Sequence, residues 1–231
     1  MEDEENNTKL WKYCGLTKAG QFHKERNLLC QDYIHHLAKG AVQAAVLADG
    51  TGENDLARKG AENSCKTLAE LLVEHFDELF EMEASLVRFQ VITNVRTRLY
   101  ELCDQYHLDL QNFHSTLMGI AINNEKNVFI AVHLGDGSIG MKIDEKIIIM
   151  SYPENGANKT QTYLTSTHKA GEHMKIIKGE IKNIREFILA SDGWNEKIGG
   201  KNQFIQEQLF ENVEESNYVD DVSFIVLRCE K

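Results

Sequence analysis

The sequence predicts an α+β protein built on a largely antiparallel sheet or sheets. Three observations support this class: strand-like runs outnumber helical patterns, the helical patterns occur as one pair and one single, and nothing alternates in the βαβ order of a parallel sheet. There is no internal repeat, no low-complexity segment and no long linker. We therefore expect one domain over residues 10–231, preceded by a mobile acidic tail over residues 1–9.

The first part of the chain predicts three strands. Residues 10–16 alternate apolar and polar side chains, and residues 33–37 form a second strand-like run. Residues 42–48 are rich in Val and Ala, as expected of a buried strand. The turn residues Lys39 and Gly40 connect the second and third runs, which predicts an antiparallel hairpin.

A pair of helices is predicted next. Asn54 or Asp55 is suited to cap the first helix. Its apolar side chains recur every three or four residues: Ala61, Cys65, Leu68, Leu72, Phe76 and Leu79. For the second helix we expect an inner face made of Leu86, Phe89, Ile92, Leu99, Leu102 and Tyr106. The linker over residues 80–84 is so short that the two helices should pack antiparallel.

For the remainder of the chain, the sequence predicts mainly short strands. The predicted strands are residues 115–122, 128–134, 138–143, 146–150, 160–166, 175–181, 187–190 and 222–227. One further helix is predicted over residues 202–214.

Composition excludes several classes of partner. The net charge of −11 argues against nucleic acid and against an anionic membrane surface. No apolar run approaches the ~20 residues that span a bilayer, and the acidic N-terminus does not resemble a signal peptide. The five cysteines are scattered and form no Cys-x-x-Cys pair, which favours reduced thiols. We expect a cytoplasmic protein that binds neither nucleic acid nor membrane.

Acidic residues stand at the ends of three predicted strands. Asp49-Gly50 follows residues 42–48, Asp192-Gly193 follows residues 187–190, and Asp220-Asp221 precedes residues 222–227. A single Asp-Gly is most simply a turn, but a carboxylate at the end of a buried strand is costly without a cation. Glycine also leaves the backbone free to turn a carbonyl toward a ligand. The three ends together predict one shared cation site.

The type of the candidate ligand atoms indicates which metal the site would bind and which reaction it would support. Carboxylate and carbonyl oxygens suit Mg²⁺ or Mn²⁺, whereas zinc would need His and Cys spacings that the chain lacks. Several carboxylates around one site commonly hold two ions ~3.5–4 Å apart, which lower the pKa of a bridging water. Such a site suits attack on phosphorus, where charge on the phosphoryl oxygens must be stabilised.

Six motifs in a fixed order resemble those of the metal-dependent serine/threonine protein phosphatase 2C family, in particular its compact bacterial branch. The resemblance covers roughly residues 10–229. The motifs are Cys30-Gln-Asp32, Ala48-Asp-Gly-Thr-Gly52, Ser115-Thr-Leu-Met-Gly119, Leu134-Gly-Asp-Gly137, Leu189-Ala-Ser-Asp-Gly193 and Asp220-Asp-Val-Ser223. The resemblance implies a four-layer αββα sandwich, two antiparallel β-sheets flanked by helices. It also implies a signalling hydrolase that acts on phosphoserine and phosphothreonine through a metal-bridging water. Its partners would be a phosphorylated protein substrate and a cognate kinase, and we expect a monomer.

The resemblance also assigns roles to individual residues. Asp49 would bridge two Mn²⁺ or Mg²⁺ ions, and Gly50 would bind through its carbonyl. Asp192 and Asp220 would hold one ion, and Asp49, Asp192 and Asp220 form the catalytic set. Asp32 would act behind the other ligands or through water. Asp136 matches a position linked, with Asp192, to a third and weaker ion.

The sequence departs from the family pattern at two positions and leaves the phosphate contact open. Thr51 replaces a His credited as general acid, and Gln31 replaces an acid that precedes Asp32 in many members. For the substrate phosphate we favour His23, with Arg26 in reserve, because this basic cluster lies nearest a motif. Two other functions stay open: a non-catalytic binding module of the same fold, and a phosphatase for a small phosphate ester.

Overall fold

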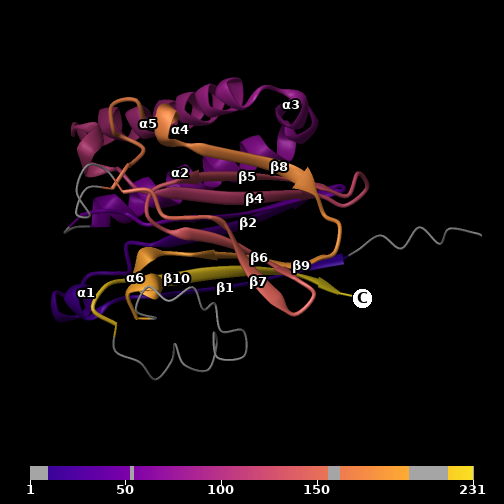
Figure 1. Cartoon of the computed structure of the whole chain (residues 1–231). Helices are drawn as coiled ribbons and strands as arrows, with labels where there is room; N and C mark the ends of the chain where they lie inside the picture. Colours follow the sequence, from indigo (N-terminus) through magenta and orange to yellow (C-terminus); the bar gives the residue numbers. More distant parts are fainter. Residues whose placement is uncertain (1–9, 53–54, 156–161, 198–217, 231) are drawn as a thin grey trace, which may run out of the picture.

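Two five-stranded antiparallel sheets pack face to face in the computed structural model, which describes residues 10–52, 55–155, 162–197 and 218–230 (Figure 1). The first sheet runs, in spatial order, β1 (Leu10–Lys18), β10 (Val222–Glu230), β9 (Ile184–Ala190), β6 (Ser138–Ile143) and β7 (Lys146–Ser151). The second runs β2 (Tyr33–Lys39), β3 (Val42–Ala48), β4 (Leu117–Asn123), β5 (Val128–Leu134) and β8 (Lys175–Glu180). The predicted α+β class with two antiparallel sheets is confirmed.

Helices cover the outer face of the second sheet (Figure 1). The long pair is α2 (Asp55–Glu74) and α4 (Ala84–Tyr106), joined by α3 (Phe76–Glu81). The shorter helical segments are α1 (Gln21–Glu25), the 3-10 turn η1 (Leu110–Asn112), α5 (Ala170–His173) and α6 (Asp192–Lys197). Helix α6 lies against the first sheet, and the predicted helix over residues 202–214 falls outside the described residues.

The apolar core forms separate layers on the two faces of the second sheet. Alternate residues of β3 face opposite sides, so Ala44 and Val46 pack toward α2 and α4, whereas Ala45 and Leu47 pack between the sheets. A third apolar cluster, which includes Trp194 and Phe224, lies under α6. Because β3 and β4 are covered on both faces, they are apolar almost throughout.

The prediction for the inner face of α4 was correct for Leu99 and Leu102, which are buried, and for Ile92 and Tyr106, which pack against the core, but it was wrong for Leu86 and Phe89. Leu86 and Phe89 are 54% and 67% exposed. The side chains that reach the core are Val87, Val91, Val95, Leu99 and Leu102. These five residues recur every three or four positions and form one buried face of the helix. Because that face is oriented toward the core, Leu86 and Phe89 point toward solvent. The stripe predicted for the first helix is buried as expected, but the helix breaks at His75, so Phe76 and Leu79 belong to α3.

Two other expectations need adjustment. Residues 162–166 form no strand apart from an isolated bridge between Asn155 and Thr162. The short helix α1 was not expected, because its five residues show no apolar periodicity.

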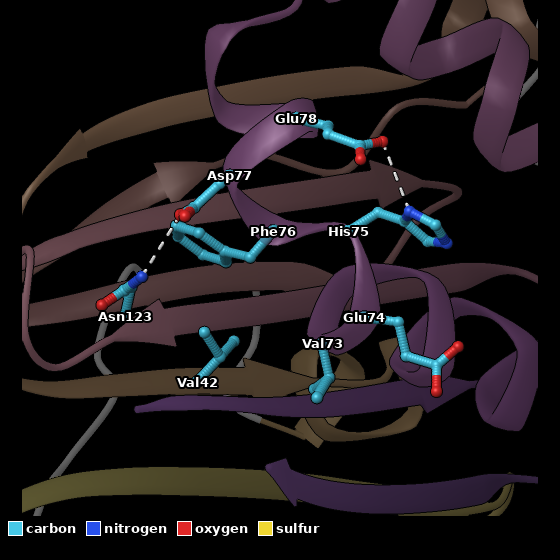
Figure 2. Close-up of a pocket in the computed structure, with 8 residues that line it drawn as sticks. All are labelled: Val42, Val73, Glu74, His75, Phe76, Asp77, Glu78 and Asn123. Atoms are coloured by element: carbon cyan, nitrogen blue, oxygen red, sulfur yellow. Dashed lines mark hydrogen bonds and ion pairs between the residues drawn. The ribbon is translucent and has the colours of Figure 1, made fainter. Parts of the chain in front are cut away.

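A cavity of about 170 Å³ lies where α2 meets α3 and the start of β3 (Figure 2). Asp77 accepts a hydrogen bond from Asn123 and pairs with Lys126, and Glu78 contacts His75. Val42, which lines this cavity, begins β3, whereas Asp49 follows the end of the same strand. The cavity therefore lies away from the predicted cation site.

Candidate active site

Strand pairing brings the predicted carboxylates to one end of the two sheets. Tyr33 pairs with Ala48, which makes Asp32 and Asp49 neighbours at the end of the β2–β3 hairpin. Ala190 pairs with Ser138 on one side and Phe224 on the other. The segments that carry Asp136, Asp192 and Asp220 therefore leave the first sheet at the same end. The sequence placed these residues correctly at strand ends, and antiparallel pairing gathers them.

The carboxylates are close enough to oppose one another's ionisation. Burial raises the pKa of Asp49 well above its usual value, and Asp32, Asp192, Asp220 and Asp136 add repulsion. Burial and the charges of Asp136 and Asp220 raise the pKa of Asp192 to about 6. Partial burial likewise raises the pKa of Asp220. The five acids therefore form one cluster of concentrated negative charge.

Asp32 is the most deeply buried of the five. Its side chain has no exposed surface, and neither carboxylate oxygen has a hydrogen-bond partner among the described residues. Burial raises the pKa of Asp32 to about 7, and the charges of Asp221, Asp192 and Asp220 add to the shift. The nearby Ser223 hydroxyl offsets part of this shift.

The donor set fits a hard divalent cation. Among the described residues, no Lys or Arg forms an ion pair with any of the five carboxylates of the cluster. Buried acids without a countercharge are costly, and a divalent ion would remove that cost. All the candidate ligand atoms are oxygens, the type that Mg²⁺ and Mn²⁺ prefer.

The backbone around Asp49 is fixed by close packing. Asp49 exchanges two 2.9 Å hydrogen bonds with Thr116: its amide donates to the hydroxyl, and its carbonyl accepts from the Thr116 amide. A Cβ at Gly50 would lie 2.7 Å from the carbonyl oxygen of Ala57 and 2.8 Å from that of Gln31. Only glycine fits there, so the predicted ligand position requires its residue type on steric grounds.

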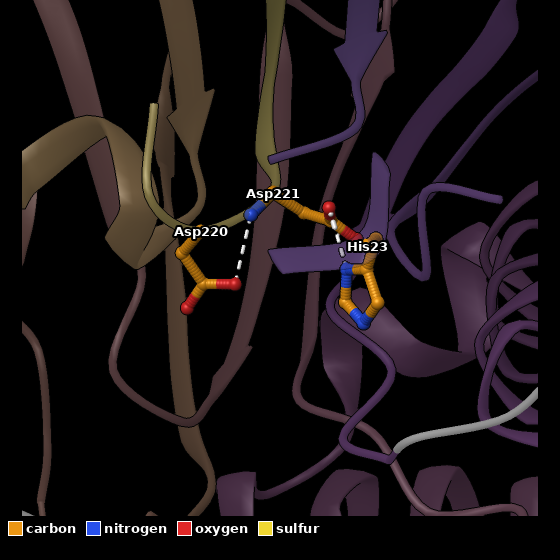
Figure 3. A group of neighbouring side chains, drawn as sticks. All are labelled: His23, Asp220 and Asp221. Atoms are coloured by element: carbon orange, nitrogen blue, oxygen red, sulfur yellow. Dashed lines mark hydrogen bonds and ion pairs between the residues drawn. The ribbon is translucent and has the colours of Figure 1, made fainter. Parts of the chain in front are cut away.

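The adjacent residues Asp220 and Asp221 have different roles in the structure (Figure 3). Asp220 is exposed, as a ligand of an open cleft would be. Asp221 is 3% exposed, and its carboxylate accepts from the amide of Gly20 at 2.7 Å and from that of Gln31 at 2.5 Å. Its third partner is Nδ1 of His23 at 2.8 Å. Asp221 therefore fastens the segment before β2 to the start of β10.

The two candidate phosphate contacts lie on α1 and just after it. His23 is 6% exposed. Because the Asp221 oxygen accepts, Nδ1 of His23 carries the proton, which leaves Nε2 for any further contact. The Arg26 guanidinium lies 3.6 Å from the centre of the Phe22 ring and donates to the Phe22 carbonyl at 3.0 Å. The structure thus brings His23 to the Asp220–Asp221 segment and folds Arg26 back onto its own helix.

Sequence reasoning missed a second set of contacts that holds Asp32. Gln31 is fully buried, and its side-chain oxygen accepts from the Arg58 amide in the first turn of α2 at 3.0 Å. The Arg58 guanidinium donates to the carbonyls of Cys30 and Asp32 at 2.5 and 3.1 Å. The residue that replaces an acid therefore joins the Asp32 segment to α2. A lone Gln in a loop gives no sequence signal of such a contact.

Two more residues lie at the rim of the site. Asp136 accepts a hydrogen bond from the hydroxyl of Thr162. Thr51 is exposed, and its amide donates to the His114 carbonyl at 3.3 Å. Its side chain therefore borders open space.

Comparison with known proteins agrees with this architecture. The family model described as protein phosphatase 2C matches residues 19–223, so the chain belongs to that family. A search of curated proteins found no significant match. Among the described residues, no helix is both long and apolar enough to cross a membrane.

Several solved structures share the fold at low sequence identity. A bacterial serine phosphatase aligns with a TM-score of 0.66 and 13% identity over 96% of this chain and 98% of its own. The serine/threonine phosphatase of S. agalactiae gives 0.63 and 15%, over 96% and 100%. RsbX in complex with magnesium gives 0.60 and 13%, over 96% and 100%.

Proposed function

We propose that the chain is a metal-dependent phosphoprotein phosphatase that hydrolyses phosphoserine and phosphothreonine. The observation that carries this proposal is the convergence of Asp32, Asp49, Asp136, Asp192 and Asp220 at one end of the sandwich. Family membership supports the reaction class, and the oxygen-only donor set supports Mn²⁺ or Mg²⁺ as cofactor. The proposed partner is a phosphorylated protein, made by a Ser/Thr kinase.

Each residue has a proposed part in this reaction. Asp49, the carbonyl of Gly50, Asp192 and Asp220 would hold two ions. Asp32 would support these ligands from behind, and Asp136 would contribute to a weaker third site. When bound, the ions would neutralise phosphate charge and lower the pKa of the attacking water. His23 is the proposed phosphate contact through Nε2, with Arg26 in reserve. Thr51 offers no imidazole to protonate the leaving alkoxide.

The test is phosphate release from a phosphothreonine peptide, compared with p-nitrophenyl phosphate and with nucleotides. We expect the peptide to be hydrolysed in Mn²⁺ or Mg²⁺ and activity to vanish in excess chelator. Asp49→Asn and Asp192→Asn should lower kcat by several orders of magnitude. Asp104→Asn removes an exposed carboxylate from α4 and serves as the matched control. Full turnover in chelator, or hydrolysis of nucleotides alone, would contradict the proposal.

A further inference from the structure

A second cavity, of about 360 Å³, opens between the edges of the two sheets. Strand β7 is the edge of the first sheet and β8 is the edge of the second. Both lie on the same side of the sandwich (Figure 1). Met150 and Tyr152 line the cavity from β7 and the segment after it, Ile177 lines it from β8, and Arg88 lines it from α4. The cavity therefore joins an apolar surface to a cationic group.

Arg88 is a cation without a described partner. Its Nε atom is buried and makes no hydrogen bond, and within the described part of the chain it forms no ion pair. The other cation of the cavity, Lys175, pairs with Glu154 at 3.0 Å and donates to the Tyr152 carbonyl at 3.0 Å. Behind the lining residue Ser151 lies His133, whose pKa burial lowers to about 4, so it carries no charge at neutral pH. Arg88 thus leaves one positive charge available in a protein of net charge −11.

Strand β7 offers a backbone template beside this charge. Edge strands are usually protected by charges, prolines or bulges, because their outer amides and carbonyls can pair with another chain. β7 contains no proline and only one charged residue, Lys146, and its pairing with β6 shifts register at Met150, between Ile149 and Ser151. The apolar residues Ile147 to Ile149 lie in the regularly paired part of the strand, so this stretch provides the template. Ile148 is 44% exposed. An extended peptide can add to such an edge and place alternate side chains in adjoining pockets.

The chain that lines the cavity continues toward the carboxylate cluster. Strand β7 ends at Ser151, and three residues later the Glu154 amide donates to the Gly135 carbonyl at 2.9 Å. Gly135 precedes Asp136. A peptide that follows β7 from the cavity is therefore led to the carboxylate end of the sheets.

From these contacts we infer a substrate subsite: the flanking segment of the phosphoprotein lies extended along β7, with an apolar side chain in the cavity and a carboxylate on Arg88. This inference rests on the proposed phosphatase function and adds a sequence preference to it. The occupant is acidic and apolar because the cavity supplies one unpaired cation and otherwise mainly apolar walls. Arg88 is then a specificity residue that contacts the flanking segment of the substrate and not the phosphate.

The experiment is a positional scan with phosphothreonine peptides that carry Glu or Lys at one flanking position at a time, with kcat/KM as the readout. At one or two neighbouring positions, the wild type should prefer Glu to Lys by about fivefold. Arg88→Glu should reverse that preference and leave the other positions unchanged. Arg185→Glu, an equal charge change at an exposed residue of β9, should keep the wild-type profile. High salt should weaken the wild-type preference.

The outcomes separate the two proposals. A wild-type profile without an acidic preference would overturn the subsite, as would one that Arg88→Glu leaves intact. Either result leaves the phosphatase function standing. If the wild type releases no phosphate from any peptide in Mn²⁺ or Mg²⁺, the proposed function is wrong. The subsite inference, which rests on that function, is then wrong as well.

Discussion

Nδ1 of His23 lies 2.8 Å from a carboxylate oxygen of Asp221, and the two residues are 6% and 3% exposed. The two residues are 198 positions apart in the sequence. The same carboxylate holds the amides of Gly20 and Gln31, so one buried acid fixes the whole approach to Asp32. The position of Asp220, one residue earlier, depends on this attachment.

Substitutions at the two adjacent acids should therefore separate stability from metal binding. Asp221→Ala leaves three buried donors without an acceptor and should lower the free energy of unfolding by about 3–5 kcal/mol. Asp220→Asn should leave stability nearly unchanged and weaken Mn²⁺ binding. Urea unfolding and calorimetric metal titration measure the two quantities. A stable Asp221→Ala protein that has lost metal binding would mean that Asp221 is the ligand.

The metal-free protein should lose stability as the pH rises. The folded pKa of Asp32, about 7, exceeds its unfolded value of ~3.9, so the folded state binds more protons between these values and the free energy of unfolding falls with pH. Asp32→Asn should remove the share of this loss that Asp32 contributes, worth on the order of a few kcal/mol at pH 8 and little at pH 4. Adding Mn²⁺ should stabilise the wild type at pH 8. Parallel pH profiles for both proteins would show that Asp32 ionises normally.

The exposed Thr51 gives a test of leaving-group chemistry. An alkoxide needs a proton on departure, whereas p-nitrophenolate does not. Because the Thr51 side chain is exposed, His can occupy this position without displacing the core. Thr51→His should raise kcat modestly for a phosphothreonine peptide and hardly at all for p-nitrophenyl phosphate. Equal gains with both substrates would point to a change in binding instead.

The phosphate contact can be assigned by the Michaelis constant. His23→Ala should raise KM for the phosphopeptide if Nε2 meets the phosphate, with Mn²⁺ affinity unchanged. Arg26→Ala is the comparison, because Arg26 stacks on Phe22 and lies on the outside of α1. A higher KM in Arg26→Ala alone would transfer the role to Arg26. Unchanged KM in both would remove this cluster from the substrate site.

Much of the fold was predictable because the strands carry strong local signals. The bounds of β3, β5 and β6 coincide with the predicted ranges, since turn residues delimit each apolar run. The inner face of α4 was partly mispredicted because Leu86 and Phe89 give an apolar stripe that competes with Val87 and Val91. Sequence spacing alone cannot rank two such stripes; packing against α2 and α5 decides.

The positions of the acidic residues could be predicted from the sequence, whereas the contacts that hold them in place could not. Asp-Gly at the end of an apolar strand has a local reason to be there, so Asp49 and Asp192 are visible in one sequence. The attachment of Gln31 to α2 and of Asp221 to Gly20 joins segments distant along the chain. No local periodicity encodes such a contact, because it depends on how loops meet after the sheets have formed.

The pairing of β1 with β10 also sets an order of events during synthesis. Strand β1 (residues 10–18) pairs with β10 (residues 222–230). β1 therefore has no strand to pair with until residues 222–230 have been synthesised. Asp220 lies two residues before β10, so a nascent chain that stops before it lacks one carboxylate of the candidate cation site. The hairpin of β2 and β3 can form early, whereas the carboxylate cluster is completed last. Much of both sheets can therefore form on the ribosome before the last carboxylate of the candidate site is synthesised.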